Sequence, residues 1–158
     1  MNDNVKKYAI SENLYDLTEN QIANLDHETT GGEGWNCYCN SYISHPTVFQ
    51  NKISGRFKNF VEDHYVEVKV QDEQIITFCS TCRQGEICAH VVALLYSWIY
   101  DSEGFNNVAE SLKHLEGMDK RELIEIIGRM VLQNPGNLDI FKDNLDEEND
   151  YDLDGLLN

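Results

Sequence analysis

The fold of this chain is decided by the stretch Cys79-Ser-Thr-Cys82-Arg-Gln-Gly-Glu-Ile-Cys88-Ala-His90-Val-Val-Ala-Leu-Leu95. It places three thiols and one imidazole within twelve residues. A structural zinc ion binds four nitrogen or sulfur ligands at the corners of a tetrahedron. The two-residue gap in the first pair suits a tight turn, and the loop 83–87 is long enough to return the chain to the metal. We therefore predict one structural Zn²⁺ ion, bound by Cys79, Cys82, Cys88 and His90.

A β-hairpin and an apolar helix are predicted on either side of these ligands. Valines alternate with polar side chains over residues 64–70, which is typical of a half-buried strand. A polar turn follows, and residues 75–78 form a return strand that delivers Cys79 to the metal. Residues 91–100 carry apolar side chains at helical spacing on two adjacent faces, which predicts a helix buried on two sides.

The rest of the chain is expected to add helices and an acidic tail. An N-terminal helix capped by Ser11 should end within residues 26–34, and Gly31-Gly32-Glu33-Gly34 should form a turn. Asp119 with Glu122 has the spacing of a capping box. The predicted fold class is α+β, with a small β-hairpin and zinc-bound loop packed on an apolar helix and followed by a helical hairpin. The expected segments are 1–49 (helix and loop), 50–102 (zinc module), 103–142 (C-terminal helices) and 143–158 (flexible acidic tail).

Several segments around the ligands resemble a SWIM zinc finger. They are Ile53-Ser-Gly-Arg-Phe57, His64-Tyr-Val-Glu-Val-Lys-Val70, Phe78-Cys79 and Cys88-Ala-His90-Val-Val-Ala-Leu-Leu95. The family's pattern is C-x-C, a variable gap and C-x-H leading into an apolar helix, usually after a glycine-containing turn and a β-hairpin. The first pair here has two intervening residues where the family usually has one. The resemblance covers about residues 50–100 and implies DNA binding or protein binding, because SWIM domains occur in helicase-like ATPases, plant transposases and recombination-accessory proteins.

A second close pair of thiols, Cys37 and Cys39, leaves alternatives open. With His45 it supplies three ligands for a second metal, although free cysteines also pack as small apolar side chains. Its spacing is that of the usual first SWIM pair, but 48 residues separate Cys39 from Cys88, a longer gap than the family usually shows. Either this pair or Cys79 with Cys82 could instead be a redox pair, although the thioredoxin-like motif needs a βαβ setting.

The net charge is strongly negative and uneven. The 158 residues include 12 Lys or Arg and 28 Asp or Glu, a formal charge of −16. Such a chain is repelled by polyanions, so non-specific binding to nucleic acid is disfavoured. Residues 51–100 are nearly neutral, with five basic and six acidic side chains, whereas residues 143–158 contain seven acidic residues. That composition favours a solvated tail.

Cysteine use and hydropathy indicate a soluble, cytoplasmic protein. Five cysteines, four of them in close pairs, do not form the pattern of a disulfide framework. Thiolate metal ligands suit a reducing compartment. The N-terminus lacks the apolar run of a signal peptide, and the longest apolar run, Val91–Leu95, is far too short to span a bilayer. We expect no association with membranes.

The favoured function is that of a non-enzymatic, zinc-stabilised adaptor that binds another protein or complex. A Cys₃His site leaves no open coordination position, and the sequence contains no nucleophilic triad or glycine-rich nucleotide loop. Candidate partner-binding residues in the acidic tail are Tyr151, Leu153, Leu156 and Leu157. The alternative is a DNA-associated SWIM protein that contacts phosphates through Lys52, Arg56 and Lys58, in a basic stretch otherwise interpreted as a glycine turn between strands. A redox enzyme is the third hypothesis.

Overall fold

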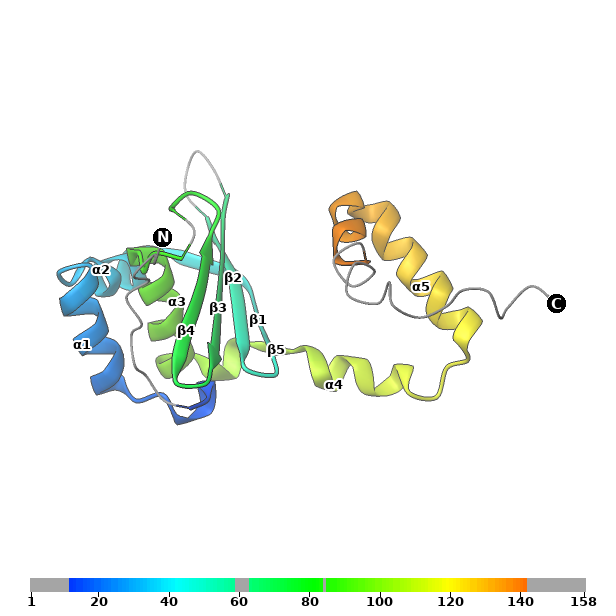
Figure 1. The fold of residues 1–158 in the computed structure, drawn as a ribbon, viewed down its shortest axis with the longest axis horizontal. Helices are drawn as coiled ribbons and strands as arrows, with labels where there is room; N and C mark the ends of the chain where they lie inside the picture. The colour runs from blue at the N-terminus through cyan, green and yellow to red at the C-terminus, as the bar shows by residue number, and fades with distance from the viewer. Residues whose placement is uncertain (1–11, 59–62, 84, 142–158) are drawn as a thin grey trace, which may run out of the picture. The chain divides into compact units, whose positions relative to one another are not determined.

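The computed structural model describes residues 12–58, 63–83 and 85–141. The fold class is α+β, as predicted (Figure 1). The chain divides after Ser111 into two compact units. The first unit contains a sheet and the helices on one side of it, and the described part of the second unit is helical. The acidic tail and its four candidate residues, Tyr151, Leu153, Leu156 and Leu157, lie outside the described residues.

The predicted hairpin is one part of a larger sheet. Five strands are arranged in the order β4-β3-β2-β1-β5, and all neighbours are antiparallel except β1 and β5. The predicted pair is β3–β4, in which Val66 lies opposite Cys79. The strand bounds are β1 (Tyr42–Phe49), β2 (Lys52–Lys58), β3 (Asp63–Gln71), β4 (Gln74–Cys79) and β5 (Asn106–Asn107).

The interpretation of residues 52–58 as a glycine turn was wrong, because this segment is the central strand β2. Its inward side chains Ile53 and Phe57 are buried, and Gly55 lies between them on the same face. A Cβ on Gly55 would lie 2.6 Å from Cγ2 of Ile43 and 3.2 Å from Cδ1 of Leu94. Gly55 therefore lets neighbouring side chains pack closely against β2. Turn propensity, which depends only on local sequence, cannot reveal such a contact.

Three helices lie on the inner side of the sheet in the first unit; the third packs on the strands, and the first two pack on the third (Figure 1). They are α1 (Glu19–Thr29), α2 (Glu33–Asn40) and α3 (Ala89–Tyr100), preceded by a 3₁₀ turn at Leu14–Asp16. Thr18 caps α1 in a capping box with Gln21. The predicted turn at residues 31–34 is shorter than expected, because α2 already begins at Glu33. Gly31 and Gly32 have positive φ and supply the turn itself.

The core lies on both sides of α3, as its two apolar faces predict. The helix contacts β2, β3 and β4 on one side and α1 and α2 on the other. Every residue from Val91 to Ser97 is buried. The sheet contributes Ile53, Phe57, Val66, Val68 and Val70, and the N-terminal helices contribute Ile22 and Leu25. The stretch that carries the four predicted ligands is therefore continuous with the most buried helix of the unit.

Both C-terminal helices are capped by side chains, and the cap of the second is the one predicted from the sequence. In α4 (Val108–Leu112), the backbone N–H of Glu110 donates a hydrogen bond to Oδ1 of Asn107 at 3.3 Å. In α5 (Lys120–Gln133), Asp119 and Glu122 form the reciprocal capping box. 3₁₀ turns occupy Ser102–Gly104, Lys113–Leu115 and Pro135–Asn137. In the part of the chain that the structure describes, no helix has both the length and the apolar character needed to cross a bilayer.

Candidate metal centre

Three structural elements bring the four predicted ligands together. Cys79 is the last residue of β4, so the sheet register fixes its position. Cys82 lies in the loop that follows. Cys88 is the N-cap residue of α3, and His90 lies in the first turn of that helix. The site thus joins the end of a strand to the beginning of the core helix.

The spacing of the four ligand atoms fits one metal ion. All four lie within 4.8 Å of one another. His90 Nδ1 is 3.8 Å from the Sγ atoms of both Cys79 and Cys82. In a tetrahedral site with metal–sulfur distances of ~2.3 Å, neighbouring ligand atoms are separated by roughly 3.5–3.8 Å. Cys79 is buried and the other three ligands are half-buried, which protects the site from bulk water.

Hydrogen bonds hold the ligand loop against the sheet. The Thr77 hydroxyl donates to the carbonyl oxygen of Glu86 at 3.1 Å, and this contact connects β4 to the far side of the loop. The backbone N–H of Ser80 donates to the carbonyl oxygen of Tyr65 at 2.9 Å, and the Ser80 hydroxyl accepts from the backbone N–H of Tyr65 at 3.0 Å. Both ends of the loop are therefore anchored independently of any metal.

The electrostatic environment of the ligands favours a bound cation. Burial opposes ionisation of Cys79, but hydrogen bonds from Thr81 and from the backbone of Cys82 outweigh it and lower the pKa of this thiol. Burial, together with the neighbouring thiols, raises the pKa of Cys88 to about 12. Three thiolates this close repel one another unless a cation compensates their charge, and coordination to a metal ion ionises a thiol outright.

A histidine that the sequence analysis did not select lies beside the cluster. The ring centroids of His64, on β3, and His90 are 5.2 Å apart. Burial and the proximity of His64 lower the pKa of His90, which favours the neutral imidazole that a metal requires. Nδ1 of His64 is buried and has no hydrogen-bond partner among the described residues. The strand alternation placed His64 but gave no indication of this contact, which depends on how α3 packs against β3.

The second thiol pair does not join this cluster. Cys79, Cys82, Cys88 and His90 form the one group of three or more potential ligands within 4.8 Å in residues 12–58, 63–83 and 85–141. Cys37 is half-buried, and its Sγ contacts Oγ of Ser41 at 3.5 Å. Burial raises the pKa of the Cys37 thiol. Cys39 is exposed on the same helix. The suggested second metal site with His45 is therefore not formed in the described structure.

The three basic residues predicted to contact phosphate lie together on the outer face of the sheet. Lys52, Arg56 and Lys58 occupy alternate positions of β2, facing away from the buried side chains of that strand. The Arg56 guanidinium lies 5.9 Å from the ring centroid of Tyr65. Lys52 Nζ is 2.8 Å from Oε1 of Glu67, so part of this positive charge is already neutralised.

Comparisons of the chain with protein-family models, curated proteins and solved structures gave no match.

Proposed function

We propose that this chain is a non-enzymatic adaptor, stabilised by one zinc ion on Cys79, Cys82, Cys88 and His90, that binds another protein. The observation that carries the proposal is the convergence of these four ligand atoms within 4.8 Å. Three thiolates and one imidazole are the ligand set of closed structural zinc sites. With all four positions of the ion occupied by protein, the ion stabilises the fold and has no vacant position for substrate.

The location of the site supports a structural role for the ion. It fastens the end of β4 to the beginning of α3, whose residues Val91–Ser97 are all buried. Zinc binding of this kind contributes on the order of 10–16 kcal/mol at neutral pH, compared with about 5–15 kcal/mol for the stability of a typical domain. Metal binding and folding of the first unit are therefore coupled in this proposal.

The resemblance to SWIM zinc fingers is part of the proposal. The β3–β4 hairpin precedes the first ligand pair, and the segment from Cys88 to His90 leads directly into α3. Both features agree with the pattern of that family over about residues 50–100. Thiolate ligation favours a reducing compartment, so we place the adaptor in the cytoplasm.

Metal analysis combined with affinity capture tests the adaptor function. The purified chain should contain one zinc per molecule, and tagged protein should retain a partner from its own cells. Cys88→Ser should abolish zinc binding and retention together, whereas Cys39→Ser, which alters an exposed thiol outside the cluster, should affect neither. A chain without zinc, or equal retention by wild type and Cys88→Ser, would contradict the proposal.

A second candidate function is binding of single-stranded DNA to the outer face of the sheet. It is favoured by the alignment of Lys52, Arg56 and Lys58 on β2, next to the ring of Tyr65 on β3. Lys69 lies opposite Lys52 and adds a fourth cation. Basic side chains beside exposed aromatic rings can contact phosphates and stack on bases. The net charge of −16 opposes this function at long range.

Salt-dependent binding tests this second candidate. A labelled single-stranded oligonucleotide should bind with log affinity falling by ~0.7 per neutralised phosphate for each unit of log salt concentration. Arg56→Gln should weaken binding and reduce that slope, whereas Arg129→Gln, an exposed arginine of α5, should leave both unchanged. Failure to bind at low salt, or equal effects of the two variants, would exclude the outer face as a DNA site.

A further inference from the structure

Four aromatic side chains form a continuous cluster on α2 and α3 and are not members of the metal-ligand group. We call Trp35, Tyr38, Tyr96 and Tyr100 the aromatic face. Their ring centroids are separated by 5.0–6.4 Å. Tyr96 is buried, but Trp35 and Tyr100 keep 44% and 43% of their surface exposed. Exposed tryptophan and tyrosine beside one another are typical of the centre of a protein-binding surface.

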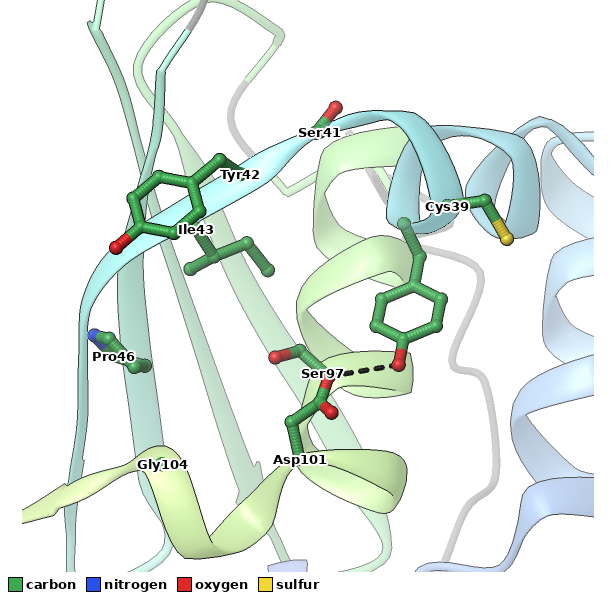
Figure 2. A pocket seen from close by; sticks show the side chains of 9 residues that line it. Cys39, Ser41, Tyr42, Ile43, Pro46, Ser97, Asp101 and Gly104 are labelled. Atoms are coloured by element: carbon green, nitrogen blue, oxygen red, sulfur yellow. Dashed lines mark hydrogen bonds between the residues drawn. The ribbon is translucent and has the colours of Figure 1, made fainter.

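A hollow of about 440 Å³ lies next to the aromatic face, between β1 and the C-terminal end of α3 (Figure 2). Tyr42, Ile43 and Pro46 form its strand side, and Tyr38 and Asp101 form its helix side. Tyr42 is 67% exposed. The hollow therefore combines apolar walls with a carboxylate, which suits a long side chain that has an aliphatic stem and a charged end.

The carboxylate in this hollow has no cation to compensate it. Tyr38 donates a hydrogen bond to Oδ2 of Asp101 at 2.8 Å, and no described residue bonds to the other oxygen. Burial and this hydrogen bond raise the pKa of Tyr38 to about 12, so the hydroxyl remains a donor at neutral pH. The proximity of Glu19 raises the pKa of Tyr100 as well. Neither Asp101 nor Glu19 forms an ion pair with a lysine or arginine among the described residues.

The segments of sequence that form this surface carry acidic side chains and no Lys or Arg. The segments 8–51 and 84–112, which supply α1, α2, β1 and α3, contain ten Asp or Glu residues and no Lys or Arg. Among the described residues, the Lys and Arg side chains of the first unit are instead in β2, β3 and the ligand loop; Lys6 and Lys7 lie outside the described residues. A uniformly negative region attracts basic ligands and repels acidic ones.

We propose that the aromatic face and the adjacent hollow bind a basic segment of a partner protein. One lysine or arginine of that segment enters the hollow and pairs with Asp101, while its stem lies against Tyr42 and Pro46. A neighbouring cation of the segment stacks on the exposed ring of Trp35. This inference rests on the proposed adaptor function and specifies the chemistry of its partner.

Peptide binding to the intact, zinc-loaded chain tests this site. The probe is a fluorescein-labelled repeat of Gly-Arg-Leu, and the control peptide has Glu in place of every Arg. Fluorescence anisotropy should show binding of the Arg peptide and none of the Glu peptide. Asp101→Asn should weaken binding about two- to fivefold, the range of one exposed ion pair. Trp35→Leu should also weaken binding, because it removes the ring that stacks on the cation.

Two controls distinguish a specific site from general attraction. Asp72→Asn makes the same change in charge at an exposed turn between β3 and β4, and it should leave affinity unchanged. Cys39 is an exposed thiol at the edge of the hollow, so bound peptide should slow its modification by a bulky maleimide, as measured by peptide mapping. Because this readout uses the wild-type chain, it does not depend on the folding of any variant.

The outcomes separate this inference from the adaptor function. Equal weakening by Asp101→Asn and Asp72→Asn would mean diffuse attraction and would overturn the site. Unchanged labelling of Cys39 at saturating peptide would do the same. Either result with one zinc per chain leaves the zinc-stabilised adaptor standing. Conversely, peptide binding by a chain without zinc would remove the adaptor proposal as formulated while retaining a site for basic segments.

Discussion

The carboxylate of Asp26, in α1, accepts a hydrogen bond at 2.9 Å from the backbone N–H of Trp35, in the first turn of α2. It also accepts from the N–H of Gly34 at 2.9 Å, from the Tyr96 hydroxyl at 3.2 Å and from the Thr30 hydroxyl. Asp26 is 2% exposed, so this buried anion is stabilised by several donors at a helix N-terminus. It connects all three helices of the first unit and fixes the orientation of the aromatic face.

Asp26→Asn should destabilise the zinc-loaded protein by about 1.5–3 kcal/mol, because hydrogen bonds to a charged group are replaced by weaker ones and the amide introduces its own donors. Urea unfolding followed by circular dichroism measures the change. Asp72→Asn, at an exposed turn, is the matched control and should be near neutral. Identical midpoints for the two variants would show that the Asp26 network contributes little to stability.

Gly34→Ala should cost about 1–3 kcal/mol through overpacking. A Cβ at this position would lie 2.4 Å from Cγ1 of Val92 and 2.6 Å from Oδ1 of Asp26, so α2 would have to move away from α3. Gly104→Ala provides the comparison, since a Cβ there meets nothing within 4 Å. Thermal unfolding of both variants tests the contact, and equal melting temperatures would indicate that α2 and α3 are not packed this closely.

Alkaline pH should destabilise the fold through Tyr96. Burial and the neighbouring Asp26 raise the pKa of this hydroxyl from its ordinary value of 10.0 to about 12 in the folded protein. The folded state then holds a proton that the unfolded chain has released. Stability is therefore full below pH 10 and falls as the pH rises toward 12.

The matching variant is Tyr96→Phe, which lacks the ionisable group. Its unfolding free energy should be lower at neutral pH because the hydrogen bond to Asp26 is lost, but it should decrease less steeply than that of wild type between pH 10 and 12. Denaturant unfolding across that range measures both slopes. If the unfolding free energies of the two proteins fell equally steeply with pH, the loss of stability at alkaline pH would be due to groups other than Tyr96.

Removal of zinc with a chelator should unfold the first unit, and Cys88→Ser should produce the same state without chelator. The expected loss exceeds what a small core can compensate, because structural zinc contributes on the order of 10–16 kcal/mol. Circular dichroism and metal content measured on one sample report the result, with Cys39→Ser as the control thiol. A chelated protein that keeps native ellipticity and cooperative melting would refute a structural role for the metal.

Helices and strands were predictable where a short stretch of sequence has a clear spacing of apolar or capping residues. The alternation of valines indicated β3, and the spacing of Asp119 and Glu122 indicated the first turn of α5, both confirmed by the structure. The four clustered ligands could be named from spacing because Cys79 and Cys82 are separated by only two residues and the other two lie at a helix start. In each case neighbouring residues in sequence are also neighbours in space.

Features that depend on distant segments were missed because the residues that form them are close in space but far apart in sequence. In the sequence alone, Gly55 resembles a turn residue. The structure shows that Ile43 and Leu94 lie where a side chain at this position would be. The strand β1 and helix α2 were not foreseen in residues 1–49, because neither has a strong periodic pattern of its own. His64 lies beside His90 only because α3 packs on β3.

The sequence by itself determined the fold class, the four side chains able to hold a metal and the segregation of acidic from basic segments. These follow from composition and from spacings of a few residues, which the covalent chain fixes. Only the tertiary structure shows that the Asp26 carboxylate accepts a hydrogen bond from the backbone N–H of Trp35. The same is true of the three cations on one face of β2 and of the carboxylate in a hollow beside exposed rings. Such relationships arise when residues tens of positions apart are packed together, and no local pattern encodes that arrangement.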